Sequence, residues 1–395
     1  SKYTGYLKPR NFEIFRETLE ANGMLDQAGD FVRASGRLQT LLYKEDVESA
    51  LRTPGMGGFQ LLQLHDFPGQ GTALVGVLDP FWEEKGYVTP DEFRRFCSRT
   101  VPLARLDTRV FTTSGTLEAD IEVSHFGAAP IADATAVWRL VGDDGRAVAS
   151  GELGPRVLPV DNGTSLGRIR VPLADLAAPA RYRLVVGLVG TPFENDWDVW
   201  VYPTHLGGDP PTGVTLAEAL DEATVAHLRD GGRVLLQVPP ARVRGDESRP
   251  IALGFSSIFW NTAWTSGQAP HTLGILCDPE HPAFDGFPTD FHSNWQWWYL
   301  VSRAAAMVLD DLPKALRPTV QVIDDWFTNR RLGLVLEAEV GEGRLLVSSI
   351  DLTTDLEENV VARQLRRSLL DYMASDRFVP TVELTPAQVR SLVKD

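Results

Sequence analysis

Cysteine is scarce in this sequence, and its spacing does not match any common metal or disulfide motif. Cys97 and Cys277 are the two cysteines among 395 residues, and neither belongs to a CxxC or Cys/His pattern. The spacing therefore indicates neither a disulfide framework nor a zinc site. Cys277 is followed by Pro279 and lacks the Gly-flanked turn of a nucleophile elbow, so we expect an inert thiol. No metal and no cofactor is expected.

The sequence also lacks an excess of basic residues and any long hydrophobic run. It has 53 acidic against 38 basic residues, a formal net charge of −15, which argues against a partner that is nucleic acid. Its longest apolar stretch, near Arg183–Val189, is far shorter than the roughly 20 residues that span a membrane. We expect a soluble protein without a membrane partner. The segment Lys2–Arg10 resembles neither a signal peptide nor a transit helix, so it assigns no compartment.

The composition is that of a globular protein, and its length predicts two or three domains. Residues 9–100 are predicted to be mainly helical, with Phe12, Phe15 and Leu19 at helical spacing. Two further helices are predicted, one from about Asp26 and one over Lys44–Arg52. Phe59–Leu64 interrupts this pattern as a short apolar run between glycines and a proline, which favours a strand buried on both faces. A buried helix is the alternative. Because a lone strand cannot satisfy its own backbone, we interpret this region as the end of an α/β structure.

Residues 103–203 change to the alternating pattern of β-strands. Leu117–Val123, Arg181–Val189 and Trp197–Tyr202 are typical strands, and Asp143-Asp144-Gly145 predicts a hairpin turn. About seven short strands over about 100 residues favour an immunoglobulin-like β-sandwich.

Residues 204–395 follow an α/β pattern after a linker rich in Gly and Pro. We predict helices over Leu216–Arg229 and Val360–Met373, separated by several apolar strands that begin with Arg233–Val238. This alternation favours an open sheet covered by helices.

Polar side chains gather where the predicted strand Phe59–Leu64 ends. His65, Asp66, Phe67 and Gln70 follow it within six residues. Because ligands of parallel α/β folds bind at the carboxyl ends of strands, these residues are our candidate binding site for a hydroxyl-rich ligand. The alternative is structural, with Asp66 capping a loop that turns at its glycines.

Two further clusters allow a functional and a structural interpretation. Glu45 and Glu48 could form the carboxylate pair of a glycoside hydrolase, but beside Lys44 and Arg52 we favour a solvated, ion-paired helix face. The second cluster could be an aromatic platform for a sugar or a partner protein, or could simply cover a core. It comprises His292, Trp295, Trp297 and Trp298.

Several segments together resemble the multidomain proteins related to glycoside hydrolase family 2, the β-galactosidase-like proteins, over nearly the whole chain. Phe59–Leu62 with Asp66–Gly71 is the most specific of these segments. The others are Tyr3–Gly5, Tyr43–Glu45 with Glu48, Leu51–Thr53, Gly58, Asn195–Trp197 and Phe287–Trp298. The resemblance implies that residues 1–102 are the C-terminal part of a (β/α)8 barrel, with Phe59–Leu64 as its eighth strand. It also implies that residues 204–395 form a flavodoxin-like or amidotransferase-like accessory domain.

The family hydrolyses β-linked sugars by a retaining mechanism with two glutamates, and no position here matches either glutamate. The resemblance therefore implies that both lie upstream of this chain, on the same protein or on a companion chain. His65, Asp66, Phe67 and Gln70 would then form one wall of the sugar pocket. The alternative is a non-catalytic carbohydrate-binding or assembly module, and a homo-oligomer stays open.

Overall fold

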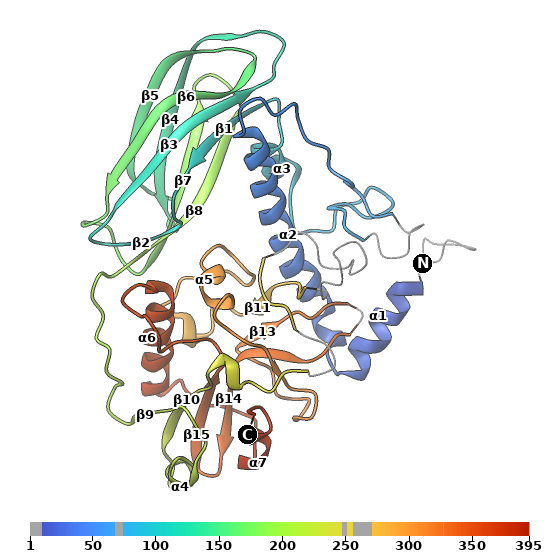
Figure 1. The fold of residues 1–395 in the computed structure, drawn as a ribbon, viewed down its shortest axis with the longest axis vertical. Coiled ribbons are helices and arrows are strands. Elements are labelled where there is room, and N and C mark those ends of the chain that lie inside the picture. The colour runs from blue at the N-terminus through green and yellow to red at the C-terminus, as the bar shows by residue number, and fades with distance from the viewer. Residues whose placement is uncertain (1–9, 68–73, 247–250, 256–270, 327, 395) are drawn as a thin grey trace. The chain divides into compact units, whose positions relative to one another are not determined.

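The computed structural model describes residues 10–67, 74–246, 251–255, 271–326 and 328–394, which form a mixed α/β protein dominated by sheets (Figure 1). The chain divides into two compact units. We call residues Gln39–Leu64 and Gly86–His205 the β unit. The mixed unit comprises Ser1–Leu38, His65–Lys85 and Leu206–Asp395. The three domains that the sequence predicts stay predictions.

The β unit contains two sheets, of three and five strands, with orders β1-β3-β6 and β2-β8-β7-β4-β5. The short helix α3 (Pro90–Phe96) precedes them, and Thr89 caps its N-terminus. The strands are β1 (Thr100–Arg105), β2 (Val110–Thr112), β3 (Thr116–His125), β4 (Ile131–Gly142), β5 (Ala147–Leu158), β6 (Asp161–Pro172), β7 (Ala180–Leu188) and β8 (Glu194–Tyr202). The predicted hairpin is confirmed, because Gly145 takes a φ of 78° in the turn between β4 and β5.

One hydrophobic core joins the two sheets of the β unit. Leu117 and Ile121 alternate along β3 with outward polar residues, and they belong to the same buried cluster as Leu140 and Leu184 of the other sheet. Two sheets that bury their inner faces against each other account for the alternation seen in the sequence. The immunoglobulin-like topology stays a prediction.

The mixed unit is organised around a seven-stranded sheet, with order β11-β13-β14-β15-β10-β9 and β12 paired to β14. β9, β10 and β15 are parallel, whereas the remaining pairs are antiparallel. The elements are β9 (Val214–Ala217), α4 (Glu222–Arg229), β10 (Arg233–Gln237), η4 (Pro240–Arg242), β11 (Ile275–Cys277), η5 (Pro282–Phe284), α5 (Trp297–Val301), β12 (Met307–Val308), β13 (Val320–Val322), β14 (Leu332–Val340), β15 (Gly343–Ser348), α6 (Val360–Ala374) and α7 (Pro386–Arg390). The helix predicted from Leu216 was placed too early, because Leu216 lies in β9 and Asp221 caps α4.

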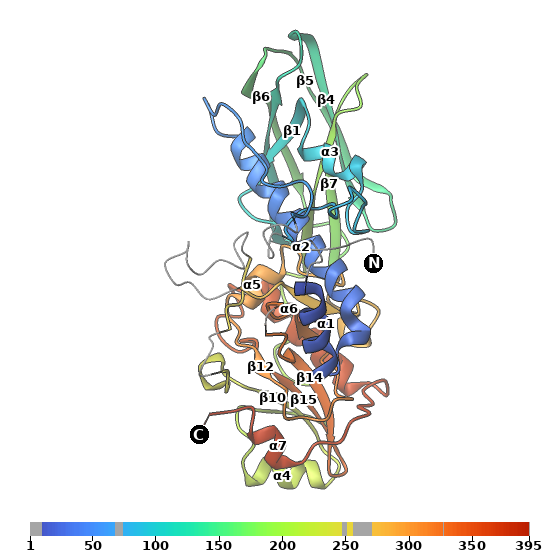
Figure 2. The ribbon, with the colours of Figure 1, turned by 90° about the vertical axis from the view of Figure 1, so that its right-hand side faces the viewer.

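Helices cover both faces of this sheet. Leu228 of α4 and Val389 of α7 share a buried cluster with Leu336 of β14. Glu337, the next residue of β14, faces the opposite way and accepts a hydrogen bond of 2.7 Å from the hydroxyl of Tyr372 in α6. Figure 2 accordingly shows α4 and α7 close together and α6 apart from them.

The predicted N-terminal helices are confirmed as α1 (Arg10–Ala21), the short η2 (Leu25–Gln27) and α2 (Ala28–Leu51). The two helices predicted within residues 26–52 are one continuous helix. Gly23, with a φ of 70°, follows the end of α1. Met24 and Phe31 bury their side chains in a cluster with Ile323, which fixes this region on the mixed unit.

The predicted buried strand Phe59–Leu64 is wrong, and so is the alternative of a buried helix. These residues form neither a strand nor a helix, and Leu62 is 75% exposed. A short apolar run lacks the periodicity that separates strand from helix, and it becomes a strand only where neighbouring strands pair with it. Phe59–Leu64 is therefore not an eighth barrel strand. Among the described residues, no helix combines the length and apolarity needed to cross a membrane.

Candidate functional site

The candidate site of the mixed unit consists of residues 65–67 and 74–85, which fold back on themselves. The Asp66 amide donates to the Leu78 carbonyl at 3.0 Å, and His65 and Leu78 form a parallel bridge. Asp79 then closes a tight loop, because its Oδ1 accepts from the amides of Phe81 and Glu83 at 2.8 and 2.9 Å. Two short stretches of backbone are thereby held side by side.

Gly76 permits the close approach of these two stretches. A Cβ atom built on Gly76 would lie 2.3 Å from the His65 carbonyl carbon and 2.5 Å from the Asp66 nitrogen. Both distances are far below a van der Waals contact, and both involve backbone that cannot rotate away. Only glycine fits at this position.

Asp66 is the central charged group of the site and is 3% exposed. Its Oδ1 accepts from Lys85 Nζ at 2.8 Å and from the Gly76 amide at 3.0 Å. Lys85 Nζ also donates to the Gly76 carbonyl at 2.7 Å. Burial raises the pKa of Asp66 above its usual value, although the Lys85 charge and these hydrogen bonds oppose the shift.

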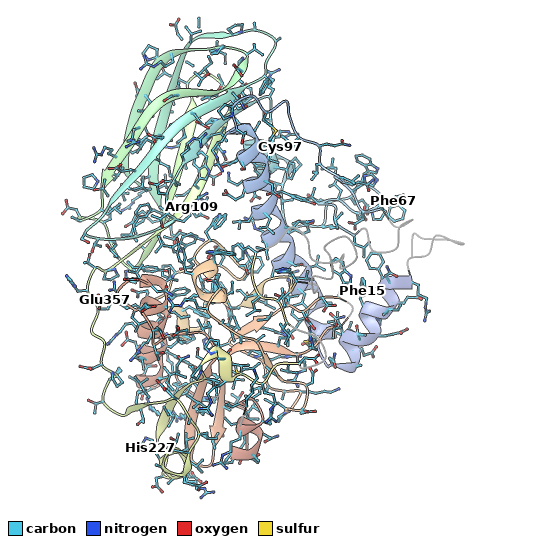
Figure 3. All side chains as sticks on the ribbon, viewed as in Figure 1. Phe15, Phe67, Cys97, Arg109, His227 and Glu357 are labelled. Atoms are coloured by element: carbon cyan, nitrogen blue, oxygen red, sulfur yellow. The ribbon has the colours of Figure 1, made fainter. Side chains whose placement is uncertain are left out.

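Aromatic side chains belong to the same segment as this ion pair. The His65 ring stacks on Trp82, with ring centroids 4.6 Å apart and an interplanar angle of 24°. Trp82 is 62% exposed and has a φ of 65°, a region that non-glycine residues seldom occupy. Phe67, labelled in Figure 3, is also exposed. Backbone conformations of this kind are concentrated at functional sites.

Several polar atoms of the site have no partner within the described part of the chain. They are both ring nitrogens of His65, the indole Nε1 of Trp82, Oδ2 of Asp66 and one of the three N–H groups of Lys85. The site thus offers hydrogen-bond donors and acceptors beside an exposed aromatic face. Of the predicted site residues, His65, Asp66 and Phe67 lie here, whereas Gln70 is outside the described residues.

The sequence did not reveal Trp82 and Lys85 as members of this site. Lys85 follows Asp66 by 19 positions, and no short motif predicts a pair at that distance. The adjacent aromatics Phe81-Trp82 in an otherwise polar turn were the available signal. No group of three or more His, Cys, Asp or Glu among the residues that the structure describes could hold a metal ion.

The second predicted site is only partly accessible. Trp297 is fully buried, its indole donates to Thr289 Oγ1 at 2.9 Å, and His292 is also buried. Trp298 is 44% exposed, and both Trp295 and Trp298 contact Phe255, with centroids 5.8 and 5.7 Å apart. Trp297 and His292 therefore belong to the core, and Trp298 keeps an open face.

Cys277 has the surroundings of a structural thiol. It is buried in β11, and its Sγ donates to the Asp290 carbonyl at 3.2 Å. Burial, with the nearby Asp290 and Asp278 charges, raises the pKa of the Cys277 thiol far above its usual value. A thiol of this kind stays protonated, which opposes a nucleophilic role.

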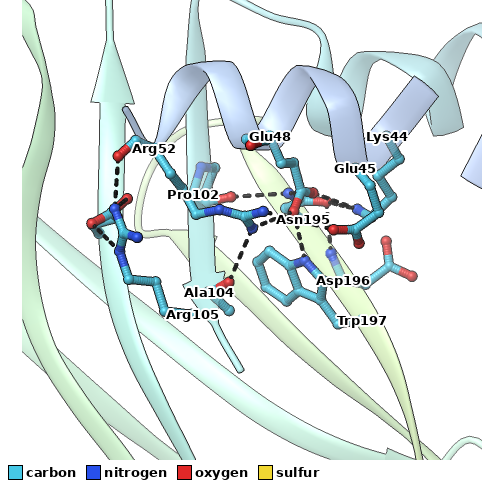
Figure 4. A network of polar contacts seen from close by, with 12 residues as sticks. Lys44, Glu45, Glu48, Arg52, Pro102, Ala104, Arg105, Asn195, Asp196 and Trp197 are labelled. Atoms are coloured by element: carbon cyan, nitrogen blue, oxygen red, sulfur yellow. Dashed lines mark hydrogen bonds and ion pairs between the residues drawn. The ribbon is translucent and has the colours of Figure 1, made fainter. Parts of the chain in front are cut away.

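The carboxylates of α2 form an ion-paired network inside the β unit (Figure 4). Glu48 is fully buried, so its predicted solvated position is wrong. Its Oε1 is 2.9 Å from Lys44 Nζ and accepts from Asn195 Nδ2 at 2.8 Å. Its Oε2 accepts from the Trp197 indole at 2.9 Å and from Arg52 at 3.3 Å. Both oxygens of Glu48 are thus fully used.

The network also covers the edge strand β1. Asn195 donates to the Pro102 carbonyl at 2.9 Å, and Arg52 donates to the Ala104 carbonyl at 3.3 Å. Burial opposes ionisation of Glu48, but the Lys44 charge and the hydrogen bonds from Lys44, Trp197 and Asn195 outweigh it and hold the pKa of this carboxyl below its usual value. The half-buried Glu45 pairs with Arg109 and Arg52 at 2.9 and 3.6 Å. Glu45 and Glu48 therefore hold this part of α2 against the sheets of the β unit.

Family models match two parts of the chain. Residues 215–394 match a family described as a domain of unknown function (DUF8487). Residues 115–203 match a second domain of unknown function (DUF8488). A search of curated proteins found no match.

Solved structures give partial likenesses of low identity. An alkylpurine DNA glycosylase of Pseudomonas fluorescens is 10% identical, with a TM-score of 0.22, over 29% of this chain and 33% of the glycosylase. The CARDB domain of a Pyrococcus furiosus protein is 13% identical, with a TM-score of 0.20, over 26% of this chain and 93% of the domain. A β-glucuronidase of Parabacteroides merdae is 12% identical, with a TM-score of 0.21, over 36% of this chain and 21% of the enzyme. This chain therefore spans about a third of the glycosylase and a fifth of the glucuronidase.

Proposed function

We propose that this chain is part of a glycoside hydrolase that acts on β-linked sugars, and that residues 65–67 and 74–85 form one wall of its sugar-binding site. The observation that carries the proposal is the exposed Trp82 ring stacked on His65, the residue that precedes the paired Asp66. The family resemblance of the same segment supports the class of reaction.

A sugar ring matches both properties of this site. The C–H groups on the face of a pyranose pack on an aromatic ring, and the hydroxyls around its rim need donors and acceptors at fixed positions. Trp82 supplies an exposed ring, and the unpaired atoms of His65, Asp66 and Lys85 supply the polar contacts. An apolar docking surface would have no need of these unpaired polar atoms.

The bond-cleaving carboxylates are proposed to come from a polypeptide segment outside residues 1–395. A retaining hydrolase needs two carboxylates about 5–5.5 Å apart, one of which must carry a proton at working pH. Glu48 is the opposite of such an acid, because its pKa is held low and its oxygens are fully bonded. Glu45 is engaged by two arginines.

Sugar binding is tested directly with the chain itself. Wild-type protein and Trp82→Ala are titrated with a panel of methyl β-glycosides and β-linked oligosaccharides, and binding is followed by saturation-transfer NMR. We expect wild type to bind at least one of them and Trp82→Ala to lose about tenfold in affinity, because it loses the buried ring area together with about 0.5–1.5 kcal/mol of stacking. Phe126→Ala, which removes an exposed ring of the β unit, is the control. Absence of binding by wild type, or equal binding by Trp82→Ala, would overturn the proposal.

Hydrolysis requires the native species. An intact mass and an SDS gel of the protein from its native source should reveal a longer polypeptide or a companion chain, and that species should cleave aryl β-glycosides. Asp66→Ala within it should weaken turnover. Full activity of that variant would remove Asp66 from the site, and a native product of these 395 residues alone would argue against hydrolysis.

One observation favours a second candidate function, a non-catalytic binding module. Trp298 exposes 44% of its surface beside Trp295 and Phe255. Trp298→Ala should then abolish glycan binding or self-association, whereas the same loss in Trp82→Ala alone would assign binding to the first site. Trp297 is unsuitable for this test because it is buried in the core.

A further inference from the structure

The unpaired atoms of the Asp66–Lys85 pair define which part of a sugar the site can recognise. Lys85 Nζ donates two hydrogen bonds, to Asp66 Oδ1 at 2.8 Å and to the Gly76 carbonyl at 2.7 Å, and these occupy two of its three N–H groups. Asp66 uses only Oδ1, which accepts from Lys85 and from the Gly76 amide. Within the described residues, one N–H of Lys85 and Oδ2 of Asp66 are left for a ligand.

These two atoms lie next to each other. Oδ1 and Oδ2 share one carbon, and Oδ1 already touches Lys85 Nζ, so the free acceptor and the free donor are neighbours. Two hydroxyls on adjacent ring carbons are spaced in the same way. One of them can donate its proton to a carboxylate while the oxygen of the other accepts from an ammonium group.

The charge of the segment selects against anionic sugars. Within residues 65–67 and 74–85, the four acidic residues Asp66, Asp79, Glu83 and Glu84 outnumber the single cation Lys85. A uronate, sulfate or phosphate group that approached the free N–H of Lys85 would also approach the Asp66 carboxylate. Like charges at close range and partial burial repel strongly, because little water screens them.

We infer that Asp66 and Lys85 bind a neutral vicinal diol of the ligand. This inference rests on the proposed function and names the substrate class of the same site. One hydroxyl donates to Asp66 Oδ2, and its neighbour accepts from Lys85 Nζ. The same chemistry occurs in neutral pyranosides and in the ribose of nucleosides, and the ligand panel separates the two.

The test uses the wild-type chain, so that it does not depend on the folding of a variant. Binding is measured by saturation-transfer NMR for three neutral methyl β-hexosides, for the matching β-uronosides, for the 2-O-methyl and 4-O-methyl ethers of each neutral hexoside, and for uridine. We expect neutral hexosides to bind, and the uronosides and the ether that blocks the recognised diol to bind about tenfold more weakly or less. Uridine binding as tight as that of the hexosides would assign the diol to ribose.

Asp66→Asn is the second measurement, because it keeps the shape of the side chain while removing its charge. It should lower the affinity for neutral hexosides about tenfold and reduce the penalty on uronosides. Asp285→Asn, which alters an exposed ion pair with Arg377 in the same unit, is the matched control.

The results of these experiments distinguish a failure of the diol inference from a failure of the proposed function. Equal binding of uronosides and neutral hexosides, or of both mono-O-methyl ethers and the parent hexoside, would overturn the diol inference while the sugar site stands. No binding of any sugar would overturn the proposed function and the inference with it. Loss of discrimination in Asp285→Asn would show that Asp66 is not the selecting group.

Discussion

Two buried carboxylates, one in each unit, have opposite surroundings. Glu48 and Asp66 are 0% and 3% exposed, and each is paired with a lysine at 2.9 and 2.8 Å. Every oxygen of Glu48 is bonded, and its pKa is lowered. Asp66 keeps one oxygen unbonded within the described residues, it is flanked in the sequence by His65 and Phe67, and its pKa is raised. A fully bonded buried charge stabilises architecture, whereas a partly bonded one beside open rings is suited to a ligand.

The largest effect should come from breaking the Glu48 network. Glu48→Gln would leave Lys44 and Arg52 without their buried counter-charge, and we expect it to destabilise the β unit by about 3–5 kcal/mol. Urea unfolding followed by circular dichroism measures the change. Glu45→Gln, at a half-buried position, should cost less than about 1 kcal/mol. Equal losses in the two variants would contradict the distinction drawn for Glu48.

A second, smaller effect concerns the backbone of the candidate site. Gly76→Ala would force the 65–67 and 74–85 stretches apart, because the added methyl overlaps the backbone of His65 and Asp66. We expect a loss of about 1–3 kcal/mol and of sugar binding. Gly208→Ala, where no atom lies within 4 Å of the added Cβ, is the control. A stable, sugar-binding Gly76→Ala would show that the close approach is dispensable.

The opposite pKa shifts predict opposite responses to pH. Glu48, with its pKa lowered in the folded state, contributes stability above its ordinary pKa of about 4.3, and this is lost as pH falls through the lowered value. Asp66, with its pKa raised, contributes stability below its ordinary pKa of about 3.9, and this is lost as pH rises through the raised value.

Unfolding free energies measured between pH 3 and pH 7 check these signs. Glu48→Gln should lose less unfolding free energy than wild type as the pH falls. Asp66→Asn should become more stable relative to wild type as the pH rises. Parallel pH profiles for the two variants would contradict the opposite pKa shifts of Glu48 and Asp66.

The smallest stability effect should belong to Trp82. Because most of its ring is exposed, Trp82→Ala should change the unfolding free energy by less than about 0.5 kcal/mol while it removes sugar binding. Thermal unfolding alongside the binding assay tests this separation. A large loss of stability in Trp82→Ala would instead show that Trp82 has a structural role.

The sequence predicted the elements whose pattern is periodic. β3, β7, β8 and α6 were recognisable because alternation and helical spacing follow directly from which face is buried. Phe59–Leu64 failed because an apolar run without a period does not report its partners.

The candidate site was predictable in part, for a related reason. His65 and Asp66 were recognisable as neighbouring polar residues that follow an apolar run. Trp82 and Lys85 join them only through a loop closure, and Glu48 is buried by Asn195 and Trp197, 147 and 149 positions away. Contacts of such long range leave no local signature in a single sequence.

The side-chain cover of β1 has a consequence for how the protein behaves at high concentration. An edge strand with open carbonyls and amides can recruit a strand from another molecule and begin aggregation. β1 contains Pro102, which has no amide hydrogen, and its carbonyls at Pro102 and Ala104 are occupied by Asn195 and Arg52. Residues that fasten α2 thus also keep this edge from joining a neighbouring copy. Loss of these side chains would leave the β1 carbonyls open to a strand of another molecule.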